Sequence, residues 1–204
     1  KLFSYIIYLN LLVQLLFNQQ DITFFCYYYI MININSKIKT TIIAGVNGDM
    51  GQEFAKNLCE TSLLCGISRG QKKSSLDYIH ITADLLKKEE IKSVFDQIYL
   101  CSNDLTYIHL PGKFRFEDEN HPITDKDKDG IDDETFDTNV NTFRNVKPCL
   151  IDYLEKNPNT KLKLVAIGST NDLYETPYWQ SFTRSKNELR KEFLLVRNEF
   201  CAIG

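Results

Sequence analysis

Short apolar segments rich in β-branched residues alternate with amphipathic segments along most of this 204-residue chain. The first apolar segment, 38–45, is followed by 48–60, in which apolar residues recur at helical spacing. This alternation is typical of parallel sheets, because two parallel strands need a crossover connection and a helix usually supplies it. We therefore expect an α/β fold with a doubly wound parallel sheet.

The same pattern predicts where each element lies. The expected strands are 38–45, 62–68, 78–82, 105–110 and 162–169. The expected helices are 48–60, 87–100, 134–156 and 179–200. In the first helix, the residues predicted to face the sheet are Met50, Phe54, Ala55 and Leu58. Between the fourth strand and the third helix we expect a long polar loop.

The two ends of the chain depart from this pattern. Residues 1–36 are apolar and aromatic, but polar residues keep every apolar run below the ~20 residues that a membrane-spanning helix needs. We interpret them as an extension outside the core, with a membrane anchor as the alternative. The α/β domain is placed at 37–204. Because the chain stops at what resembles the start of a further strand, we expect that domain to be C-terminally truncated.

Composition excludes several classes of protein. With 43% hydrophobic and 25% charged residues, the chain is too apolar to be disordered. A net charge of -3 without a basic stripe gives no reason to expect nucleic-acid binding. No two histidines have helical ligand spacing, so no metal site is predicted. The six cysteines are scattered, and we expect reduced thiols in a cytoplasmic protein: Cys26, Cys59, Cys65, Cys101, Cys149 and Cys201.

Three glycines separate the first strand from the first helix. Gly45, Gly48 and Gly51 have the spacing G-x-x-G-x-x-G, a variant of the dinucleotide-binding fingerprint. In that interpretation, Gly45 makes the tight turn and Gly48 allows the backbone to approach a pyrophosphate. Gly51 lets the helix pack closely on the sheet. The alternative is a purely structural turn.

Two residues at the ends of later strands bear on the choice of cofactor. Arg69 ends the second strand, about where the residue that contacts the ribose is expected. A cation there suits a 2′-phosphate, so we predict NADP, with NAD as the alternative cofactor. Asp84 follows the third strand and could accept a hydrogen bond from an adenine amino group or cap the next helix.

From about residue 38 to 200, these features resemble the short-chain dehydrogenase/reductase family. The glycine turn matches the family's first turn, and Asp84 matches its adenine-binding Asp. Asn139 lies in the helix that carries the family's catalytic Asn, and Ser169 lies where its catalytic Ser belongs. The resemblance implies a Rossmann-like fold and a nicotinamide cofactor. It also implies a carbonyl or alcohol substrate and a homo-oligomer.

The family's Tyr-x-x-x-Lys motif corresponds here to Phe182 and Lys186. In the family, the Tyr passes a proton to or from the substrate oxygen, and the Lys lowers the pKa of that Tyr and holds the nicotinamide ribose. Phenylalanine has no proton to give, and losing a positioned acid costs about 10²–10⁴-fold in rate. Tyr178, one helical turn earlier, is the substitute donor that the sequence offers. Residues 109–112 likewise match the family's Asn-Asn-Ala-Gly only at Gly112.

An acidic segment at 125–134 resembles the opening of a calcium loop. Its twelfth position would be Phe136, where such a loop requires a bidentate Glu. A solvated acidic loop is the alternative, and we include no metal among the expected ligands.

Our sequence-based hypothesis is an oxidoreductase of the short-chain type that transfers a hydride between NADP(H) and a carbonyl or alcohol. The predicted catalytic residues are Ser169, Lys186, Asn139 and Tyr178. The predicted cofactor-binding residues are Gly45, Asn47, Gly48, Met50, Gly51, Arg69, Asp84, Leu85, Gly112 and Lys186. A catalytically impaired relative that binds NAD(P) and acts as a regulatory or interaction module is the alternative. An inactive fragment is a third hypothesis.

Overall fold

The computed structural model describes residues 39–97, 103–117, 132–169 and 176–203. Within these residues, parallel strands form a single sheet in the order β3-β2-β1-β4-β5. The strands are β1 (Thr40–Ala44), β2 (Leu63–Ser68), β3 (Ile79–Thr82), β4 (Asp104–His109) and β5 (Lys161–Ala166). The expected α/β fold with a doubly wound parallel sheet is confirmed.

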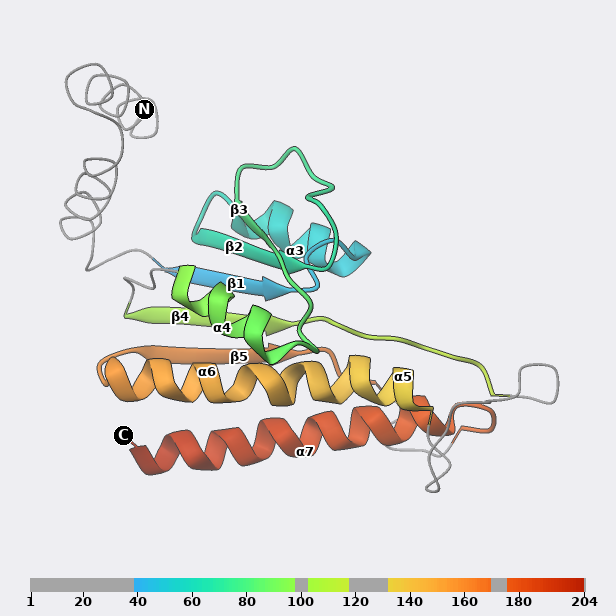
Figure 1. Ribbon diagram of the computed structural model, residues 1–204. Coiled ribbons are helices and arrows are strands. Elements are labelled where there is room, and N and C mark those ends of the chain that lie inside the picture. The colour runs from blue at the N-terminus through green and yellow to red at the C-terminus, as the bar shows by residue number, and fades with distance from the viewer. Residues whose placement is uncertain (1–38, 98–102, 118–131, 170–175, 204) are drawn as a thin grey trace, which may run out of the picture. The chain divides into compact units, whose positions relative to one another are not determined.

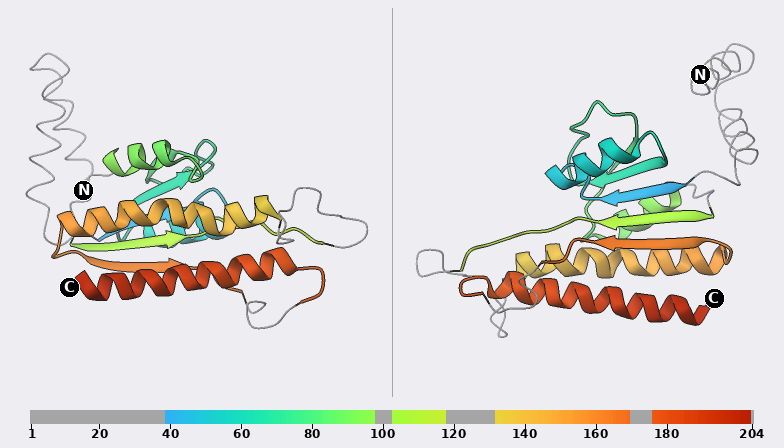
Figure 2. Two further views of the ribbon diagram at one scale, coloured as in Figure 1. Left: turned by 60° about the horizontal axis from the view of Figure 1, so that its bottom comes forward. Right: turned by 180° about the vertical axis from the view of Figure 1, so that it is seen from behind.

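Helices cover both faces of the sheet, as Figures 1 and 2 show. They are α3 (Asp49–Leu58), α4 (Lys88–Gln97), α5 (Asp133–Phe136), α6 (Thr142–Lys156) and α7 (Gln180–Ile203), with a π-helical turn, η1 (Asp137–Asn141), between α5 and α6. Helix α3 lies on one face, α4 and α6 lie on the other, and α7 packs beside α6. None of the helices in the described part of the chain is both long and apolar enough to cross a bilayer.

Strand β1 is the centre of the fold, and all of its residues are buried. Successive side chains point to opposite faces of a strand. Ile43 therefore packs with Ala55 of α3, whereas Ile42 packs on the other face with Ile91 and Val146. Because β2 and β4 lie on opposite sides of β1, the connections diverge at its carboxyl end. In open α/β sheets, this divergence opens the crevice where ligands bind.

The structure differs from the predicted elements chiefly at strand β5 and within the helix predicted at 134–156. Strand β5 ends at Ala166 rather than at residue 169, because Ala166 pairs with His109, the last residue of β4, and no partner strand continues beyond it. Residues 167–169 therefore follow the strand instead of belonging to it. The predicted helix 134–156 exists as a continuous helical segment, but η1 interrupts its regular winding.

The prediction that Met50 faces the sheet is wrong. Its side chain is 50% exposed, whereas Gly51 and Ala55 are the buried residues of α3. The helix rests on the sheet through Gly51, where a Cβ atom would lie only 2.7 Å from the Cα atom of Val46. Such close packing directs Met50, the preceding residue, away from the core.

Candidate functional site

The glycine turn begins directly at the end of β1. Gly45 has a φ of +81°, a conformation that side-chain-bearing residues rarely adopt, and its amide donates to the carbonyl of Ile67 at 2.8 Å. A Cβ atom on Gly45 would also lie 3.1 Å from the backbone nitrogen of Pro111. The turn therefore brings the end of β1 close to the segment that follows β4.

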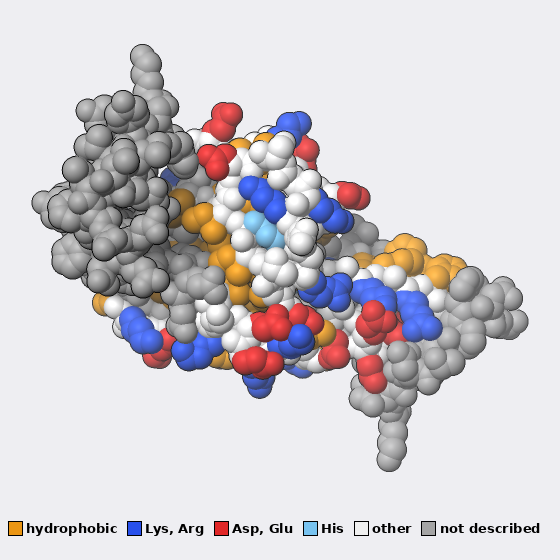
Figure 3. Space-filling model, turned by 45° about the horizontal axis from the view of Figure 1, so that its top comes forward, with side chains coloured by type: hydrophobic (Ala, Val, Ile, Leu, Met, Phe, Trp, Pro, Cys, Tyr) orange, Lys and Arg blue, Asp and Glu red, His pale blue; other side chains and the backbone are white. Residues whose placement is uncertain are grey.

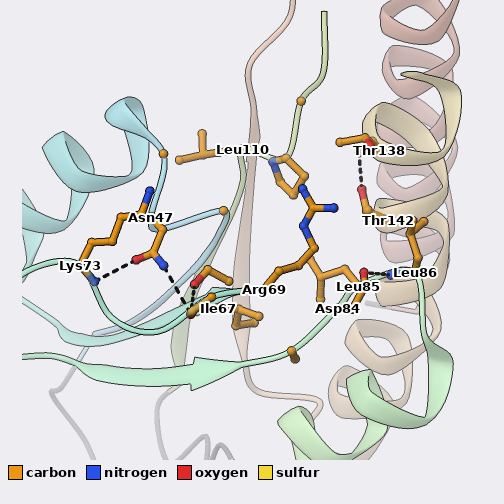
Figure 4. Close-up of a pocket in the computed structure, with 17 residues that line it drawn as sticks. Asn47, Ile67, Arg69, Lys73, Asp84, Leu85, Leu86, Leu110, Thr138 and Thr142 are labelled. Carbon is orange, nitrogen blue, oxygen red and sulfur yellow. Dashed lines mark hydrogen bonds between the residues drawn. The ribbon is translucent and has the colours of Figure 1, made fainter. Parts of the chain in front are cut away.

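A cavity of about 430 Å³ opens at the carboxyl ends of the strands (Figure 4). Its walls come from the glycine turn and from the segments that follow β2, β3 and β4, with η1 and α6 closing one side. The residues that line it are Gly45, Asn47, Gly48, Ile67, Ser68, Arg69, Gly70, Lys73, Ala83, Asp84, Leu85, Leu86, Leu110, Pro111, Gly112, Thr138 and Thr142. Most of the predicted cofactor-binding residues are therefore brought together at one cavity.

Three predicted cofactor-binding residues do not line this cavity. Met50 is exposed on α3, and Gly51 is buried under the turn, where it provides the close packing predicted for it. Lys186 is the third, but its amine is close to a residue that does line the cavity, because it lies 3.7 Å from where a Cβ atom on Gly112 would be.

Asn47 holds the segment after β2 in place. Its side-chain amide donates to the carbonyl of Gln71 at 2.7 Å and to that of Gly70 at 3.4 Å, and its oxygen accepts from the amide of Lys73 at 3.3 Å. Figure 4 shows Asn47 beside Lys73 on the wall of the cavity. The sequence pattern placed Asn47 in the site but did not indicate this bridging role.

Two cations stand on the wall that follows β2. Arg69 and Lys73 both line the cavity, and Figure 4 shows the Arg69 side chain extending across it. Lys72 does not line the cavity, because its amine donates to the carbonyl of Tyr78 at 3.0 Å and lies 4.0 Å above the centre of the Tyr78 ring. Of the three cations that follow β2, Arg69, Lys72 and Lys73, two therefore line the site.

Asp84 and Leu85 form the wall that follows β3. The Asp84 carboxylate accepts from the amide of Leu86 at 3.0 Å, which closes the turn before α4. Because Leu86 precedes α4, this contact belongs to a turn before the helix and is not a cap of the helix itself, and Asp84 still borders the cavity. Its contact with an adenine stays a prediction. Leu85 is buried, and its carbonyl accepts from the Asn145 side chain at 3.1 Å.

Asn139 lies in η1 and pins the segment after β4. Its amide nitrogen donates to the carbonyl of Lys113 at 3.0 Å, and its oxygen accepts from the amide of Lys113 at 2.7 Å. The same nitrogen donates to the hydroxyl of Ser185 at 2.7 Å, which ties η1 to α7. Asn139 therefore joins three segments within reach of Lys186.

Lys186 is buried, at 8% exposure, and its amine donates to the carbonyl of Ile167 at 3.2 Å. Burial lowers the pKa of Lys186, because the charged form loses solvation. Ser169 follows Ile167 by two residues and is half-buried. Ser169 and the carbonyl that Lys186 contacts thus belong to the same short segment beyond the end of β5.

Phe182, which is predicted at the position of the family's tyrosine, lies among aromatic rings. The centre of the Phe182 ring is 5.6 Å from the Lys186 amine, 5.4 Å from the Phe114 ring and 6.3 Å from the Trp179 ring. Tyr178 precedes α7 rather than belonging to it, with a φ of +67°. Because it lies outside the helix, the one-turn spacing assumed for it is wrong, and the ring that it contacts is that of Phe116, at 5.6 Å. Its role as a proton donor stays a prediction.

A buried chain of hydrogen bonds that the sequence did not reveal ends at the cavity. The Thr142 hydroxyl donates to the carbonyl of Thr138 at 2.8 Å, so the 3.2 Å contact with His109 requires Nε2 of His109 to donate. Nδ1 then accepts from the hydroxyl of Tyr107 at 3.2 Å. Burial, followed by the charge of Lys186, lowers the pKa of His109 to about 3. The histidine is therefore a neutral, fully paired link between the core and the cavity.

Sequence reasoning also missed Ser68, Thr138 and Thr142 as lining residues. Ser68 could have been found, because it is the last residue of a strand whose carboxyl end faces the crevice. The two threonines depend on how η1 packs, for which the sequence carries no clear signal. Most of the acidic segment 125–134 lies outside the described residues, so the calcium hypothesis is untested. Asp132, within the described part, pairs with Arg115 at 2.9 Å and caps α5.

Solved structures with the same fold are short-chain dehydrogenases. A short chain dehydrogenase family protein from Francisella tularensis has a TM-score of 0.63 and 21% identity over 82% of this chain and 66% of its own. A short chain dehydrogenase from Leptospira borgpetersenii with bound NAD+ has a TM-score of 0.68 and 16% identity over 85% and 70%. One from Burkholderia cenocepacia in complex with NADP has a TM-score of 0.65 and 13% identity over 82% and 68%.

These similarities confirm the predicted resemblance in fold. The chain spans 66% of the length of the Francisella protein. No protein-family model and no curated protein matches the sequence.

Proposed function

We propose that this chain binds NADP(H) in the cavity at the carboxyl ends of β1, β2 and β4, and transfers a hydride between it and a carbonyl or alcohol substrate. The observation that carries the proposal is the position of Lys186, whose buried amine lies next to Gly112, a residue that lines that cavity. A buried lysine at this place supplies a positive charge where a reacting oxygen would develop negative charge.

The residues of the cavity fit a dinucleotide. A volume of about 430 Å³ lies within the range of small-molecule sites. Gly48 is the N-cap of α3, so the amides of the first turn of that helix offer partners for a phosphate. Arg69 and Lys73 add two cations beyond the end of β2. Of the described residues that line the cavity, only Asp84 is a carboxylate, and it follows β3 rather than β2.

That distribution of charge favours NADP(H) over NAD(H). An acidic side chain after β2 would accept from a ribose 2′-hydroxyl and repel a 2′-phosphate. The arginine present there can instead form charge-assisted hydrogen bonds with a phosphate. The short-chain dehydrogenase from Burkholderia cenocepacia with the same fold is in complex with NADP, which is compatible with this assignment.

The bound cofactor would supply or accept the hydride, and the chain's own residues would manage charge and protons. Reducing a carbonyl leaves an alkoxide that must receive a proton. Lys186 carries the charge that would stabilise that oxygen, and Ser169 offers a hydroxyl beyond the end of β5. Phe182 occupies the place from which the family's tyrosine delivers the proton, so this step is expected to be slow.

Phe182 also favours a second candidate function. Its ring packs 5.4 Å from Phe114 and has no group that exchanges protons. A chain that retains the dinucleotide cavity while lacking the acid suits a protein that binds NADP(H) as a regulatory signal without consuming it. The two candidates share the cavity and differ only in turnover.

Fluorescence titration with NADPH and NADH tests the shared part of the proposal. We expect NADPH to bind more tightly. Arg69→Gln should weaken NADPH binding by about tenfold or more, since a hydrogen bond to a charged group contributes about 1.5–3 kcal/mol. The same variant should leave NADH binding nearly unchanged. Lys56→Gln on the outer surface of α3 is the matched control, because it removes one exposed cation outside the cavity.

Absence of binding by either dinucleotide would overturn both candidates. If NADPH binds, its oxidation is measured in the presence of a panel of ketones and aldehydes. This measurement distinguishes the two candidate functions. Measurable turnover supports the oxidoreductase, and binding without turnover supports the regulatory candidate.

A further inference from the structure

The Ser68 hydroxyl joins the wall of the cavity to a histidine behind it. Ser68 lines the cavity, and its Oγ lies 2.9 Å from Nε2 of His80 on β3. The same hydroxyl donates to the carbonyl of Gly70 at 3.0 Å. Because Ser68 has only one proton, its bond to Gly70 requires Nε2 of His80 to be the donor to Ser68.

Protonation of His80 keeps both contacts. In the doubly protonated ring, Nε2 still donates to Ser68, and Nδ1 gains the added proton. The ring is half-buried on an edge strand, so solvent protons can reach it. The segment after β2 can therefore acquire a further positive charge without giving up a hydrogen bond.

Basic side chains surround this pair. Arg69 and Lys73 line the cavity beside Ser68, and Lys72 lies over the Tyr78 ring, which meets the His80 ring edge-on at 6.3 Å. Figure 3 shows this face, where lysine and arginine side chains gather around a histidine. Together these groups form a basic cluster, which we define as Arg69, Lys72, Lys73 and His80.

The charged groups near His80 come from few elements. The β2–β3 segment brings the three cations of the cluster and Asp77, and helix α3, on the same side of the sheet as Tyr78, carries Asp49, Glu53 and Lys56. Burial lowers the pKa of His80, and of all these groups only the charge of Lys72 adds to that lowering. His80 is therefore neutral near pH 7 while the cavity is free of ligand.

We propose that His80 is a pH-dependent specificity residue, which strengthens binding of the 2′-phosphate of NADP(H) when it is protonated and leaves NAD(H) binding unaffected. This inference rests on the proposed function, because it assigns a further group to the same phosphate site. A phosphate held by Arg69 and Lys73 next to Ser68 would stabilise the imidazolium form, since an opposite charge favours protonation. By linkage, protonation of His80 must strengthen phosphate binding by the same factor.

Calorimetric titration with NADP+ and NAD+, which unlike the reduced forms survive in acid, tests the inference in the wild-type protein and in His80→Gln. The amide of glutamine keeps a donor for Ser68 but cannot titrate. We define the preference as the affinity for NADP+ divided by that for NAD+. Between about pH 8 and about pH 5.5, the preference of the wild type should rise about three- to eightfold relative to the variant. This corresponds to a rise of roughly half a unit to one unit in the pKa of His80 on binding.

Because wild type and variant are compared at the same pH, the effect of the ligand's own protonation on affinity cancels. The 2′-phosphate takes up a proton itself near pH 6, which weakens its binding equally in both proteins. Lys72→Gln provides a second variant. Without the repulsion from Lys72, His80 should protonate at a higher pH, so the change in preference should begin at a higher pH than in the wild type.

Nuclear magnetic resonance of the His80 ring gives an independent readout. Its pKa should rise when NADP+ is added and should not respond to NAD+. An equal preference in wild type and His80→Gln at every pH, with NADP+ still bound, would overturn this inference while leaving the proposed function intact. If the wild-type protein bound neither NADP+ nor NAD+, the proposed function would instead be overturned.

Discussion

The Lys186 amine lies 5.6 Å from the centre of the Phe182 ring, one helical turn away on α7. The two residues share a helix face, as an i, i+4 pair must. The ammonium lies close to an aromatic ring within the range of a cation–π contact, and it also donates to the carbonyl of Ile167. In the proposed function, this ammonium is the charge that would activate a phenol, and the hydroxyl is what Phe182 lacks.

Phe182→Tyr should therefore create or raise carbonyl reductase activity. A positioned general acid contributes about 10²–10⁴-fold in rate, and Lys186 is placed to favour ionisation of the new phenol. NADPH oxidation with a panel of carbonyl compounds measures the gain. Phe182→Leu is the matched control, because it changes the ring without adding a proton donor. Equal turnover in the two variants would show that Phe182 does not occupy the position of the acid.

Gly51→Ala should destabilise the fold, whereas Gly48→Ala should not. A Cβ atom at Gly51 would meet the backbone of Val46 at 2.7 Å, and such overpacking costs about 1–3 kcal/mol. At Gly48, the nearest atom to an added Cβ is 3.5 Å away, which is an ordinary contact. Denaturant unfolding measures the free energy of unfolding of each variant. Gly48→Ala should instead weaken dinucleotide binding, because its methyl group stands where the backbone approaches the pyrophosphate. The interpretation of the glycine turn fails if Gly48→Ala binds normally.

Asp49→Asn should strengthen the binding of NADPH and NADH equally. Asp49 lies in the first turn of α3, where its negative charge opposes a phosphate at the same helix end. Charges near a helix terminus contribute about 0.3–1 kcal/mol, which corresponds to roughly two- to fivefold in affinity. Glu53→Gln, one turn further along the exposed surface of α3, is the control. A gain for NADPH alone would place the effect at the 2′-phosphate instead of the pyrophosphate.

Acid should destabilise the protein through His109. Its folded-state pKa is about 3, against about 6.5 for an unperturbed histidine, so the unfolded chain takes up more protons between these values. The stability that the neutral ring contributes is complete above about pH 6.5 and is lost as the pH falls toward 3. The expected slope approaches about 1.4 kcal/mol per pH unit.

Denaturant unfolding between about pH 7 and about pH 5, above the range in which most carboxylates titrate, measures this slope, to which His80 also contributes because its pKa is lowered. His109→Gln should reduce it, since glutamine cannot take up a proton when the chain unfolds. If His109→Gln kept the wild-type slope, the loss of stability in acid would arise from groups other than His109.

The sequence was sufficient to predict the sheet, because burial dictates the pattern of a central strand. The five residues of β1 are all buried, and the run from Thr40 to Ala44 is correspondingly continuous. It also identified Gly45 and Gly51, because only glycine tolerates the turn and the close packing at those positions. Because Lys186 follows Phe182 at helical spacing, the sequence also predicts Phe182 at the position of the family's tyrosine, which stays a prediction.

The tertiary structure alone decided how the side chains of the cavity are used. Asn47 forms hydrogen bonds with a loop more than twenty residues away, and Ser68 on β2 contacts His80 on the neighbouring strand β3. His109 links Tyr107 to Thr142. Met50 was assigned to the core by periodicity, yet the close approach at Gly51 leaves it exposed. Periodicity reports which face of an element is buried, whereas a hydrogen bond between distant segments depends on the register of the strands and on the rotation of each helix, which local sequence does not encode.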